Sequence, residues 1–427
     1  MATVSRRTLL QAGAGLAMAG PLAACSSGLG GSAGGDKITI GFVSPRTGST
    51  AGFGEPDGYV LDQARKALAN GLQLAGKSYR VEIVDKDSQS NPQRSAQVTN
   101  DLINSSGVDL VLTTSTPETV NPASDACEAA GVPCISTIVP WEAWYFGRGA
   151  KEGEPSPFKY TYHFSFGVEQ FHKQYTSLWS QVPTNKKVGV MWPNDADGNA
   201  IRKSLGPLLS QSGYTIVDPG AYTDGTNDFS SQIARFKAEN CEVFNTFPLP
   251  PDFATFWQQA AQQGYKPKIA QIAKTGLFVS QVEALGPSAV GLAGGTYWSP
   301  TFPYRATLTG VTSQQLGDGY TAATGKQWNQ QLGPSTALFD VAVAALKATA
   351  NPKDKAGLAK TISTVSADTT LGKIAFGTGP VPNVVPIGVH GGQWRKATGG
   401  PFQLEFLICE NSNDPNVPTA TKLRPYA

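Results

Sequence analysis

From Lys37 onward, short apolar stretches alternate with longer segments of helical periodicity, and this alternation restricts the fold more than any other feature. Four stretches rich in Val, Ile and Leu are predicted to be strands: 38–43, 79–84, 109–112 and 132–136. The segments between them carry apolar residues at helical spacing: 58–70, 92–105 and 122–130. Because strands that alternate with helices form parallel sheets with helices on both faces, the pattern predicts an α/β fold with a doubly wound sheet.

A second run of the same kind starts after an aromatic loop. Its predicted strands are 187–192, 214–217, 242–245 and 268–272. Its predicted helices are 200–212, 229–239 and 253–263. The remainder is predicted to form helices at 335–350 and 355–365, and then strands at 373–376, 386–389 and 402–409. Two such layouts in a chain of 427 residues predict two domain-sized α/β units.

The charge balance excludes one large class of function. The chain has 34 Lys and Arg against 32 Asp and Glu, which gives a net charge of +2, and no acidic or basic block stands out. A protein that binds nucleic acid usually concentrates basic residues, so we expect no nucleic-acid partner. The apolar share of 40% predicts a folded chain and not a disordered one.

Residues 1–25 are predicted to be a twin-arginine signal peptide of a lipoprotein. The pair Arg6-Arg7 precedes an apolar stretch that is shorter than the ~20 residues of a membrane-spanning helix. The stretch ends in Leu22-Ala23-Ala24-Cys25, which resembles a bacterial lipobox. The resemblance implies that Cys25 is lipidated and becomes the first residue of the mature protein. The alternative is an ordinary cleaved signal with a chance cysteine.

The segment that follows, residues 26–36, is rich in Gly and Ser and is predicted to be a flexible tether. A signal peptide, a lipidated cysteine and a tether together predict an extracytoplasmic protein that is lipid-anchored to the cell membrane.

Four cysteines lie beyond the predicted signal peptide: Cys127, Cys134, Cys241 and Cys409. Outside the cytoplasm they could form disulfides, and the sequence leaves open whether they do, because geometry decides it. No Cys-x-x-Cys occurs and the chain has only 3 His, so no metal site and no cofactor are expected.

Catalytic motifs are also missing from the sequence, so we expect no enzyme. No Gly-x-Ser-x-Gly occurs, and none of the histidines belongs to a recognisable motif. Residues 319–326 resemble a phosphate-binding loop, but the spacing is wrong by one. In addition, Gln327 stands where such a loop requires Ser or Thr.

Four short motifs follow one another along the chain, each at the end of a predicted strand. They are residues 40–48 (IGFVSPRTG) followed by Phe53-Gly54, residues 85–92 (DKDSQSNP), residues 114–116 (TST) with 121–125 (NPASD), and residues 192–198 (WPNDADG). In this order, behind a lipobox, they are similar to the signatures of type I periplasmic binding proteins. The branch they resemble is the Leu/Ile/Val-binding family of ABC transporter substrate-binding proteins, and the likeness runs from Lys37 to the C-terminus.

The resemblance implies the type I periplasmic-binding-protein fold, with two doubly wound parallel-sheet lobes joined by a three-segment hinge. Lobe one would comprise 37–162 plus 297–370, and lobe two 163–296 plus 371–427. The chain would cross between lobes near Tyr162-His163, Tyr297-Trp298 and Thr370-Leu371. Hinge closure would trap a ligand in the cleft between the lobes.

The function implied is that of an extracytoplasmic solute-binding lipoprotein of an ABC importer. It would capture a small organic solute, either an amino acid, an amino-acid-like compound or an aromatic compound. Its partners would be an ABC permease in the cytoplasmic membrane and the membrane itself, through the anchor at Cys25, and monomers are usual for the family. The alternative is a ligand-sensing lobe that works with a separate signalling partner.

Ligands of open parallel sheets bind beyond the carboxyl ends of the strands, and this rule selects the candidate site. The selected loops are 44–54, 113–117, 137–145, 192–198, 247–253 and 273–277. By resemblance, Ser115 and Thr116 hold a ligand carboxylate, and Thr137, Ile138 and Val139 form the next contact loop. The alternative for Thr116, or for Thr119, is a helix cap.

Two positions depart from the amino-acid-binding members of the family. Where those proteins have a tyrosine before Gly, this chain has Asp197, which could accept ligand donors or serve as a turn residue. Where they have an acidic residue that meets the ligand ammonium, this chain has Ala273-Lys274-Thr275. Lys274 could pair with an anionic ligand or lie at the surface as a solvated charge.

Aromatic residues gather near the same strand ends: Phe53, Trp141, Trp144, Tyr145, Trp192, Phe247 and Trp298. Aromatic walls suit a flat apolar ligand or the face of a sugar, so we expect a ligand that is larger or more aromatic than leucine. The alternative is that several of them only pack the lobe interface. The predicted ligand-binding residues are Phe53, Ser115, Thr116, Thr137, Val139, Trp141, Asp197, Phe247, Lys274 and Trp298.

Overall fold

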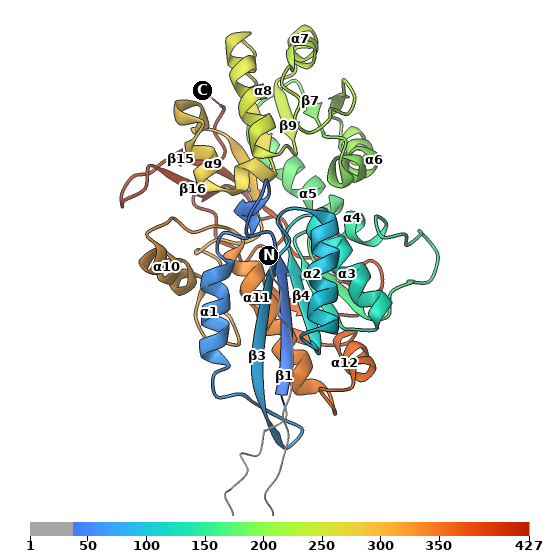
Figure 1. Cartoon of the computed structure of the whole chain (residues 1–427). Coiled ribbons are helices and arrows are strands. Elements are labelled where there is room, and N and C mark those ends of the chain that lie inside the picture. Colours follow the sequence, from blue (N-terminus) through green and yellow to red (C-terminus); the bar gives the residue numbers. More distant parts are fainter. Residues whose placement is uncertain (1–36, 427) are drawn as a thin grey trace, which may run out of the picture. The chain divides into compact units, whose positions relative to one another are not determined.

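The computed structural model describes residues 37–426, so the predicted signal peptide, Cys25 and the tether lie outside the described residues. Residues 37–426 form two seven-stranded sheets and a separate two-stranded one, each of the large sheets being flanked by helices (Figure 1). The predicted α/β architecture with two mainly parallel sheets is therefore confirmed.

The first sheet has the strand order β14-β6-β5-β4-β1-β3-β2. Its strands are β1 (Lys37–Ser44), β2 (Leu72–Leu74), β3 (Lys77–Asp87), β4 (Leu110–Thr114), β5 (Cys134–Thr137), β6 (Thr161–Phe164) and β14 (Val384–Val385). All neighbours run parallel except β2, which is antiparallel to β3 at one edge. β1 lies inside the sheet and is buried along its whole length after Lys37, as is typical of a strand covered on both faces.

Two helix layers cover this sheet. The helices are α1 (Asp57–Ala67), α2 (Pro92–Asn104), α3 (Pro117–Ala130), α4 (Trp141–Tyr145), α10 (Ser313–Thr324), α11 (Leu332–Ala348) and α12 (Lys355–Ile362). Alternate residues of β1 separate the layers: Ile40 and Phe42 share a core with α1 and α11, whereas Val43 shares one with α2 and α3. α11 is buried nearly all round because it packs on both α1 and the sheet.

The second sheet has the order β16-β15-β11-β10-β9-β7-β8. Its strands are β7 (Lys187–Met191), β8 (Thr215–Val217), β9 (Val243–Thr246), β10 (Ile269–Ile272), β11 (Ala293–Thr296), β15 (His390–Lys396) and β16 (Leu404–Ile408). The first five are parallel, whereas β15 is antiparallel to both of its neighbours. The remaining strands, β12 (Ser366–Thr369) and β13 (Gly372–Ala375), form an antiparallel pair that packs on α11.

Longer helices also flank the second sheet. They are α5 (Val168–Trp179), α6 (Ala196–Gln211), α7 (Ser230–Ala238) and α8 (Pro250–Gln262). The shorter ones are α9 (Val279–Glu283) and the 3-10 turns η2 (Lys274–Leu277) and η3 (Gly286–Ala289), whereas the 3-10 turn η1 (Ala51–Phe53) follows β1 of the first sheet. Aromatic stacking ties α8 to β9, since the rings of Phe244 and Phe256 lie 4.7 Å apart and nearly parallel.

The chain passes between the two sheets after β6, after β11 and after β14. The first and third passages come later than the lobe boundaries expected from the sequence. His163 and Phe164 belong to β6, which pairs with β5, and Val384-Val385 pair with β6 in the same sheet. The reason is that β14 brings a segment far along the chain back to the edge of the first sheet.

Among the helices that begin earlier than the sequence predicted, α3 and α6 matter for the candidate site. α3 begins at Pro117 instead of Pro122, because Pro117 occupies the first turn, where proline is favoured, and Thr116 precedes it in extended conformation. α6 begins at Ala196, because the side chain of Asp195 accepts a hydrogen bond from Gly198 N and caps the helix.

Cys127, Cys134, Cys241 and Cys409 are buried free thiols in the described structure. None of the helices within residues 37–426 is long and apolar enough to cross a membrane.

Candidate functional site

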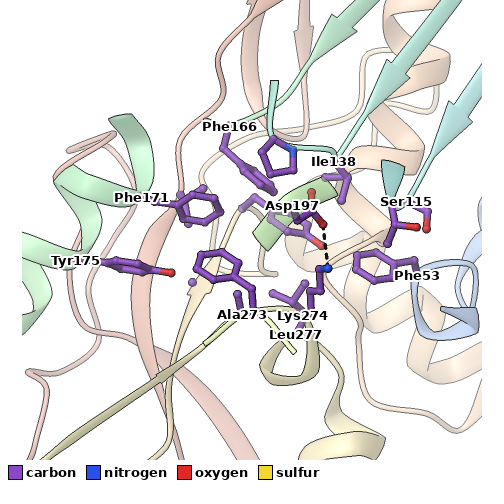
Figure 2. Close-up of a pocket in the computed structure, with 16 residues that line it drawn as sticks. Phe53, Ser115, Ile138, Phe166, Phe171, Tyr175, Asp197, Ala273, Lys274 and Leu277 are labelled. Carbon is purple, nitrogen blue, oxygen red and sulfur yellow. Dashed lines mark ion pairs between the residues drawn. The ribbon is translucent and has the colours of Figure 1, made fainter. Parts of the chain in front are cut away.

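One pocket lies where loops from both sheets meet, beyond the carboxyl ends of their strands. Its lining residues are Phe53, Ser115, Thr116, Ile138, Pro140, Phe166, Phe171, Tyr175, Asp197, Phe247, Ala273, Lys274, Leu277, Gly295, Tyr297 and Val389. The space not filled by protein is about 560 Å³, and part of it is open to solvent. Figure 2 shows these side chains.

Two hydroxyl groups lie on one side of this pocket. Ser115 and Thr116 join the end of β4 to the start of α3, and both are buried. Within residues 37–426 neither hydroxyl has a hydrogen-bond partner, and Thr116 makes no side-chain cap to α3. Thr119, the other candidate cap, instead shares a hydrogen bond of 2.9 Å with Ser88. Two buried hydroxyls at a helix N-terminus are therefore free to bind a ligand, and this position favours an anionic group.

Strained backbone occurs in the lining of the pocket. Three of its lining residues other than glycine have positive φ: Ser115 at 117°, Ile138 at 79° and Lys274 at 43°. A β-branched residue such as Ile138 rarely adopts this conformation, and such strain persists only where the surrounding structure enforces it. The strain therefore suggests that these loops are shaped for a ligand.

The charged groups of the pocket are held in one cluster. The ammonium of Lys274, at the start of η2, lies 2.6 Å from Oδ2 of Asp195 and 3.0 Å from Oδ2 of Asp197. All three side chains are nearly buried, with exposed fractions of 9%, 12% and 6%. Figure 2 shows the pair Lys274–Asp197 with Ser115 and Phe53 on one side and Phe166, Phe171 and Tyr175 on the other.

Burial and mutual attraction act together on the ionisation of this cluster. Burial raises the pKa of Asp197 to about 7, Lys274 opposes the rise, and Asp195 adds to it. Burial by itself lowers the pKa of Lys274, but the carboxylates of Asp197 and Asp195 outweigh this effect and hold it above its ordinary value. The lysine therefore keeps its charge at neutral pH.

Aromatic rings form the other side of the pocket. Phe166, just after β6, stacks on Tyr297 with ring centroids 5.4 Å apart. Phe171 of α5 meets Phe247 edge to face at 5.4 Å. Tyr175 lies one turn further along α5, beside Phe171. This wall gives the pocket an apolar, aromatic end opposite the hydroxyls of Ser115 and Thr116.

Of the residues predicted from the sequence, six line the pocket: Phe53, Ser115, Thr116, Asp197, Phe247 and Lys274. Asp197 is not merely a turn residue, because it lies in the first turn of α6 and points its carboxylate at Lys274. Lys274 is not a solvated surface charge, because it is buried.

Four other predicted residues do not line the pocket, and each has partners elsewhere. The hydroxyl of Thr137 donates to the carbonyl of Phe164 in the neighbouring strand at 2.7 Å. Val139 and Trp141 belong to a separate cluster around α4. Trp298 is fully buried in the core and donates to Ser313 at 3.2 Å. Trp298 packs instead beside Gly317 of α10 and Gly333 of α11.

Three other aromatic residues that the sequence placed near strand ends are core residues: Trp144, Tyr145 and Trp192. Trp144 stacks on His163 at 4.9 Å, and Tyr145 packs against Phe158. Trp192 donates to Asn245 at 2.8 Å inside the second sheet. These three aromatic residues therefore pack in the protein interior and do not line the pocket.

Several lining residues were missed at the sequence level, among them Phe166, Phe171, Tyr175 and Tyr297. One signal was available: Phe171 and Tyr175 are four residues apart on a helix, so they share one face of α5. Within residues 37–426 no group of three or more His, Cys, Asp or Glu side chains is arranged to hold a metal ion.

A family model described as periplasmic binding protein matches residues 37–382. The chain belongs to this family. Among its relatives in the periplasmic binding protein family is the Leu/Ile/Val-binding protein homolog 8 of Brucella abortus, which is 24% identical over 242 residues. That match covers 54% of this chain and 56% of the relative, so the chain spans about half the length of the curated relatives it matches.

Solved periplasmic binding proteins share the fold. The substrate-binding protein LivJ from Streptococcus pneumoniae, in complex with isoleucine, has a TM-score of 0.67 at 19% identity and matches 87% of this chain and 100% of its own. A solute-binding protein of an ABC transporter from Rhodopseudomonas palustris, in complex with 3,4-dihydroxy benzoic acid, has a TM-score of 0.67 at 18% identity and matches 88% and 99%. The predicted resemblance to type I periplasmic binding proteins is confirmed.

Proposed function

We propose that the protein is an extracytoplasmic solute-binding protein of an ABC importer and that it captures a small organic solute in the pocket between its two sheets. The observation that carries the proposal is the pairing of two unpartnered, buried hydroxyls with an aromatic wall across one pocket. The hydroxyls do not stabilise the described protein by themselves, because buried hydroxyls without partners carry a desolvation cost. A ligand that is polar at one end and apolar at the other would satisfy both.

The polar end of the solute is a carboxylate bound at Ser115 and Thr116. Both hydroxyls can donate to it, and the positive end of the α3 dipole points toward the same place. The apolar end lies against Phe166, Phe171 and Phe247. The names of the solved relatives support this class, since isoleucine and 3,4-dihydroxy benzoic acid are both carboxylic acids with an apolar part.

The rest of the function follows from the family. We propose that two lobes, one around each sheet, close on the solute by hinge motion at the three passages between the sheets, and that the closed form docks on a membrane permease. Lipidation at Cys25 would keep the protein near that permease. The pocket has no catalytic task in this proposal, so the solute should be recovered chemically unchanged after incubation.

A thermal-shift screen tests the proposal. The panel holds aliphatic and aromatic amino acids, aromatic carboxylates, amides, polyamines and sugars. A solute that binds only the folded state raises the melting temperature, with about 2.7 kcal/mol of stabilisation at a hundredfold excess over Kd. We expect carboxylic acids with an aromatic or bulky apolar group to give the largest shifts.

Two outcomes would count against it. A flat response across the panel would contradict solute capture in this pocket. A shift with leucine that equals or exceeds those with the aromatic acids would contradict the aromatic preference alone.

A further inference from the structure

The pocket lining among residues 37–426 contains a single carboxylate and a single ammonium, and they are bonded to each other. The carboxylate is Asp197 and the ammonium is Lys274, 3.0 Å apart. Lys274 also donates to Asp195, which lies just outside the lining, at 2.6 Å. The positive charge in this part of the pocket is therefore supplied by the protein.

The acceptor oxygens of this cluster are nearly all in use. Asp195 accepts from Gly198 N at 2.6 Å through Oδ1 and from Lys274 through Oδ2. Asp197 uses Oδ2 for Lys274, whereas its Oδ1 is buried and has no partner in the part of the chain that the structure describes. One acceptor atom is thus left for a ligand, and a single hydroxyl or N–H donor satisfies it.

A ligand ammonium fits this arrangement poorly. It would have to approach Asp197 beside the buried charge of Lys274, and like charges repel strongly where water is excluded. Lys274 cannot readily move aside, because its side chain is 9% exposed and its backbone is held at a φ of 43°. Leaving the cluster would also strip two buried carboxylates of their counter-ion.

We propose that Lys274 is a specificity residue that acts as an internal counter-ion to Asp197, so that the pocket selects carboxylic acids without an α-ammonium group. A hydroxyl at the α-position would donate to Oδ1 of Asp197. The inference rests on the proposed solute-binding function and names its substrate class.

The alternative is that the excess of negative charge around the cluster, and not the ammonium of Lys274, governs ligand binding. Glu118 and Asp224 add negative charge around the same cluster. If this surplus governed binding, a ligand ammonium would be attracted to it, and amino acids would bind more tightly than their α-hydroxy analogues.

Isothermal titration with matched pairs of ligands distinguishes these two predictions. The first pair is L-phenylalanine and L-phenyllactic acid, and the second is L-leucine and L-leucic acid. The members of each pair differ only in an α-ammonium or an α-hydroxyl group. We expect the hydroxy acid of at least one pair to bind the purified protein about tenfold or more tightly than its amino acid.

The variant Lys274→Met provides the second part of the experiment. It removes the charge and keeps an unbranched side chain, so the ratio of the two Kd values should change in favour of the amino acid by about tenfold or more. Lys353→Met is the matched control, because Lys353 is also paired with a buried carboxylate, that of Asp109 at 2.6 Å, but does not line the pocket. It should leave the ratio unchanged.

If Lys274→Met fails to fold, Asp197→Asn takes its place. This variant keeps the ammonium of Lys274 with Asp195, so the preference against the amino acid should persist or increase.

The outcomes are distinguishable. A preference for the hydroxy acid that Lys274→Met reduces supports the inference. Equal or tighter binding of the amino acids by the unmodified protein overturns it and leaves the solute-binding function standing. If no member of either pair binds and the wider panel is also flat, the proposed function fails and the inference fails with it.

Discussion

The ammonium of Lys274 lies 2.6 Å from Oδ2 of Asp195, and this contact ties the loop after β10 to the first turn of α6. The same aspartate caps α6 through its other oxygen, which accepts from Gly198 N at 2.6 Å. One side chain therefore fixes both the start of a helix and the position of the pocket lysine. Helix capping and the positioning of the pocket lysine share a residue in this protein.

Replacing Asp195 should separate its two tasks. Asp195→Asn keeps an oxygen that can cap α6 but loses the charge paired with Lys274, whereas Asp195→Ala loses both. We expect the alanine variant to have a free energy of unfolding about 1 kcal/mol lower than the asparagine variant, measured by urea titration. Asn91→Ala is the control for the loss of a helix cap, because Asn91 caps α2 by accepting a hydrogen bond from Arg94 N at 2.8 Å. Equal stabilities of the two Asp195 variants would show that the cap contributes nothing.

The free hydroxyls of the pocket should matter for binding without stabilising the unliganded protein. Ser115→Ala and Thr116→Val remove no hydrogen bond within the described residues and relieve the desolvation cost of a buried hydroxyl, so the free energy of unfolding should stay the same or rise by about 1 kcal/mol. The Kd for a carboxylic acid that binds should rise about tenfold for each, measured by isothermal titration.

Ser95→Ala is the matched control for these variants. The hydroxyl of Ser95 is also buried but donates to the carbonyl of Thr119 at 2.6 Å. It should cost about 1 kcal/mol of stability and leave the affinity unchanged. A loss of stability in the pocket variants without a loss of affinity would contradict a binding role for Ser115 and Thr116.

Trp298 should behave as a core residue although its position in the sequence suggested a ligand contact. It is fully buried, and it packs so closely on Gly333 that a Cβ there would lie 2.2 Å from Cγ of the indole. Trp298→Ala should lower the free energy of unfolding by on the order of 3 kcal/mol and leave the solute Kd unchanged at temperatures where it is folded. Phe247→Ala, which removes a lining ring, should raise that Kd, so equal effects on affinity would contradict this assignment.

Asp340 should make the stability depend on pH. It is buried on α11, one oxygen accepts from Leu308 N at 2.7 Å, and the other has no partner within residues 37–426. Burial raises the pKa of Asp340 from 3.8 to about 7. Because the folded state holds this proton at higher pH than the unfolded chain, its contribution to stability is present below about pH 4 and is lost as the pH rises through about 7.

Asp340→Asn tests this contribution. Each unit of pKa difference is worth about 1.4 kcal/mol, so relative to the unmodified protein the variant should gain a few kcal/mol between pH 4 and pH 8. Urea titrations at both pH values measure the gain. A stability difference between the two proteins that does not change with pH would contradict it.

Much of the fold could be predicted from local pattern. The strand predicted at 38–43 and the helix predicted at 92–105 correspond to β1 and α2 within a residue or so. Both could be predicted because burial on both faces and helical periodicity are recognised from consecutive residues. The start of α3 could not be predicted as well, since either Pro117 or Pro122 suits a first turn. The passage near Thr370 was placed too early, because β14 joins the first sheet through a pairing with the distant β6.

The candidate site, like the fold, could be predicted only in part from the sequence. The rule that ligands bind at the carboxyl ends of strands selected the loops that contain Ser115, Asp197 and Lys274. The family resemblance then singled out these three residues within the loops. It could not tell which aromatic rings turn inward. Phe247 lines the pocket, whereas Trp298 is buried in the core.

The sequence by itself therefore determined the alternation of strands and helices, the family and the loops that carry the site. Only the tertiary structure decided which side chains meet there, that Lys274 is paired with Asp195 and Asp197, and that the hydroxyls of Ser115 and Thr116 are without partners among the described residues. The physical reason is that periodicity and capping act over a few neighbouring residues. Burial, ion pairing and backbone strain depend instead on which distant segments pack against one another.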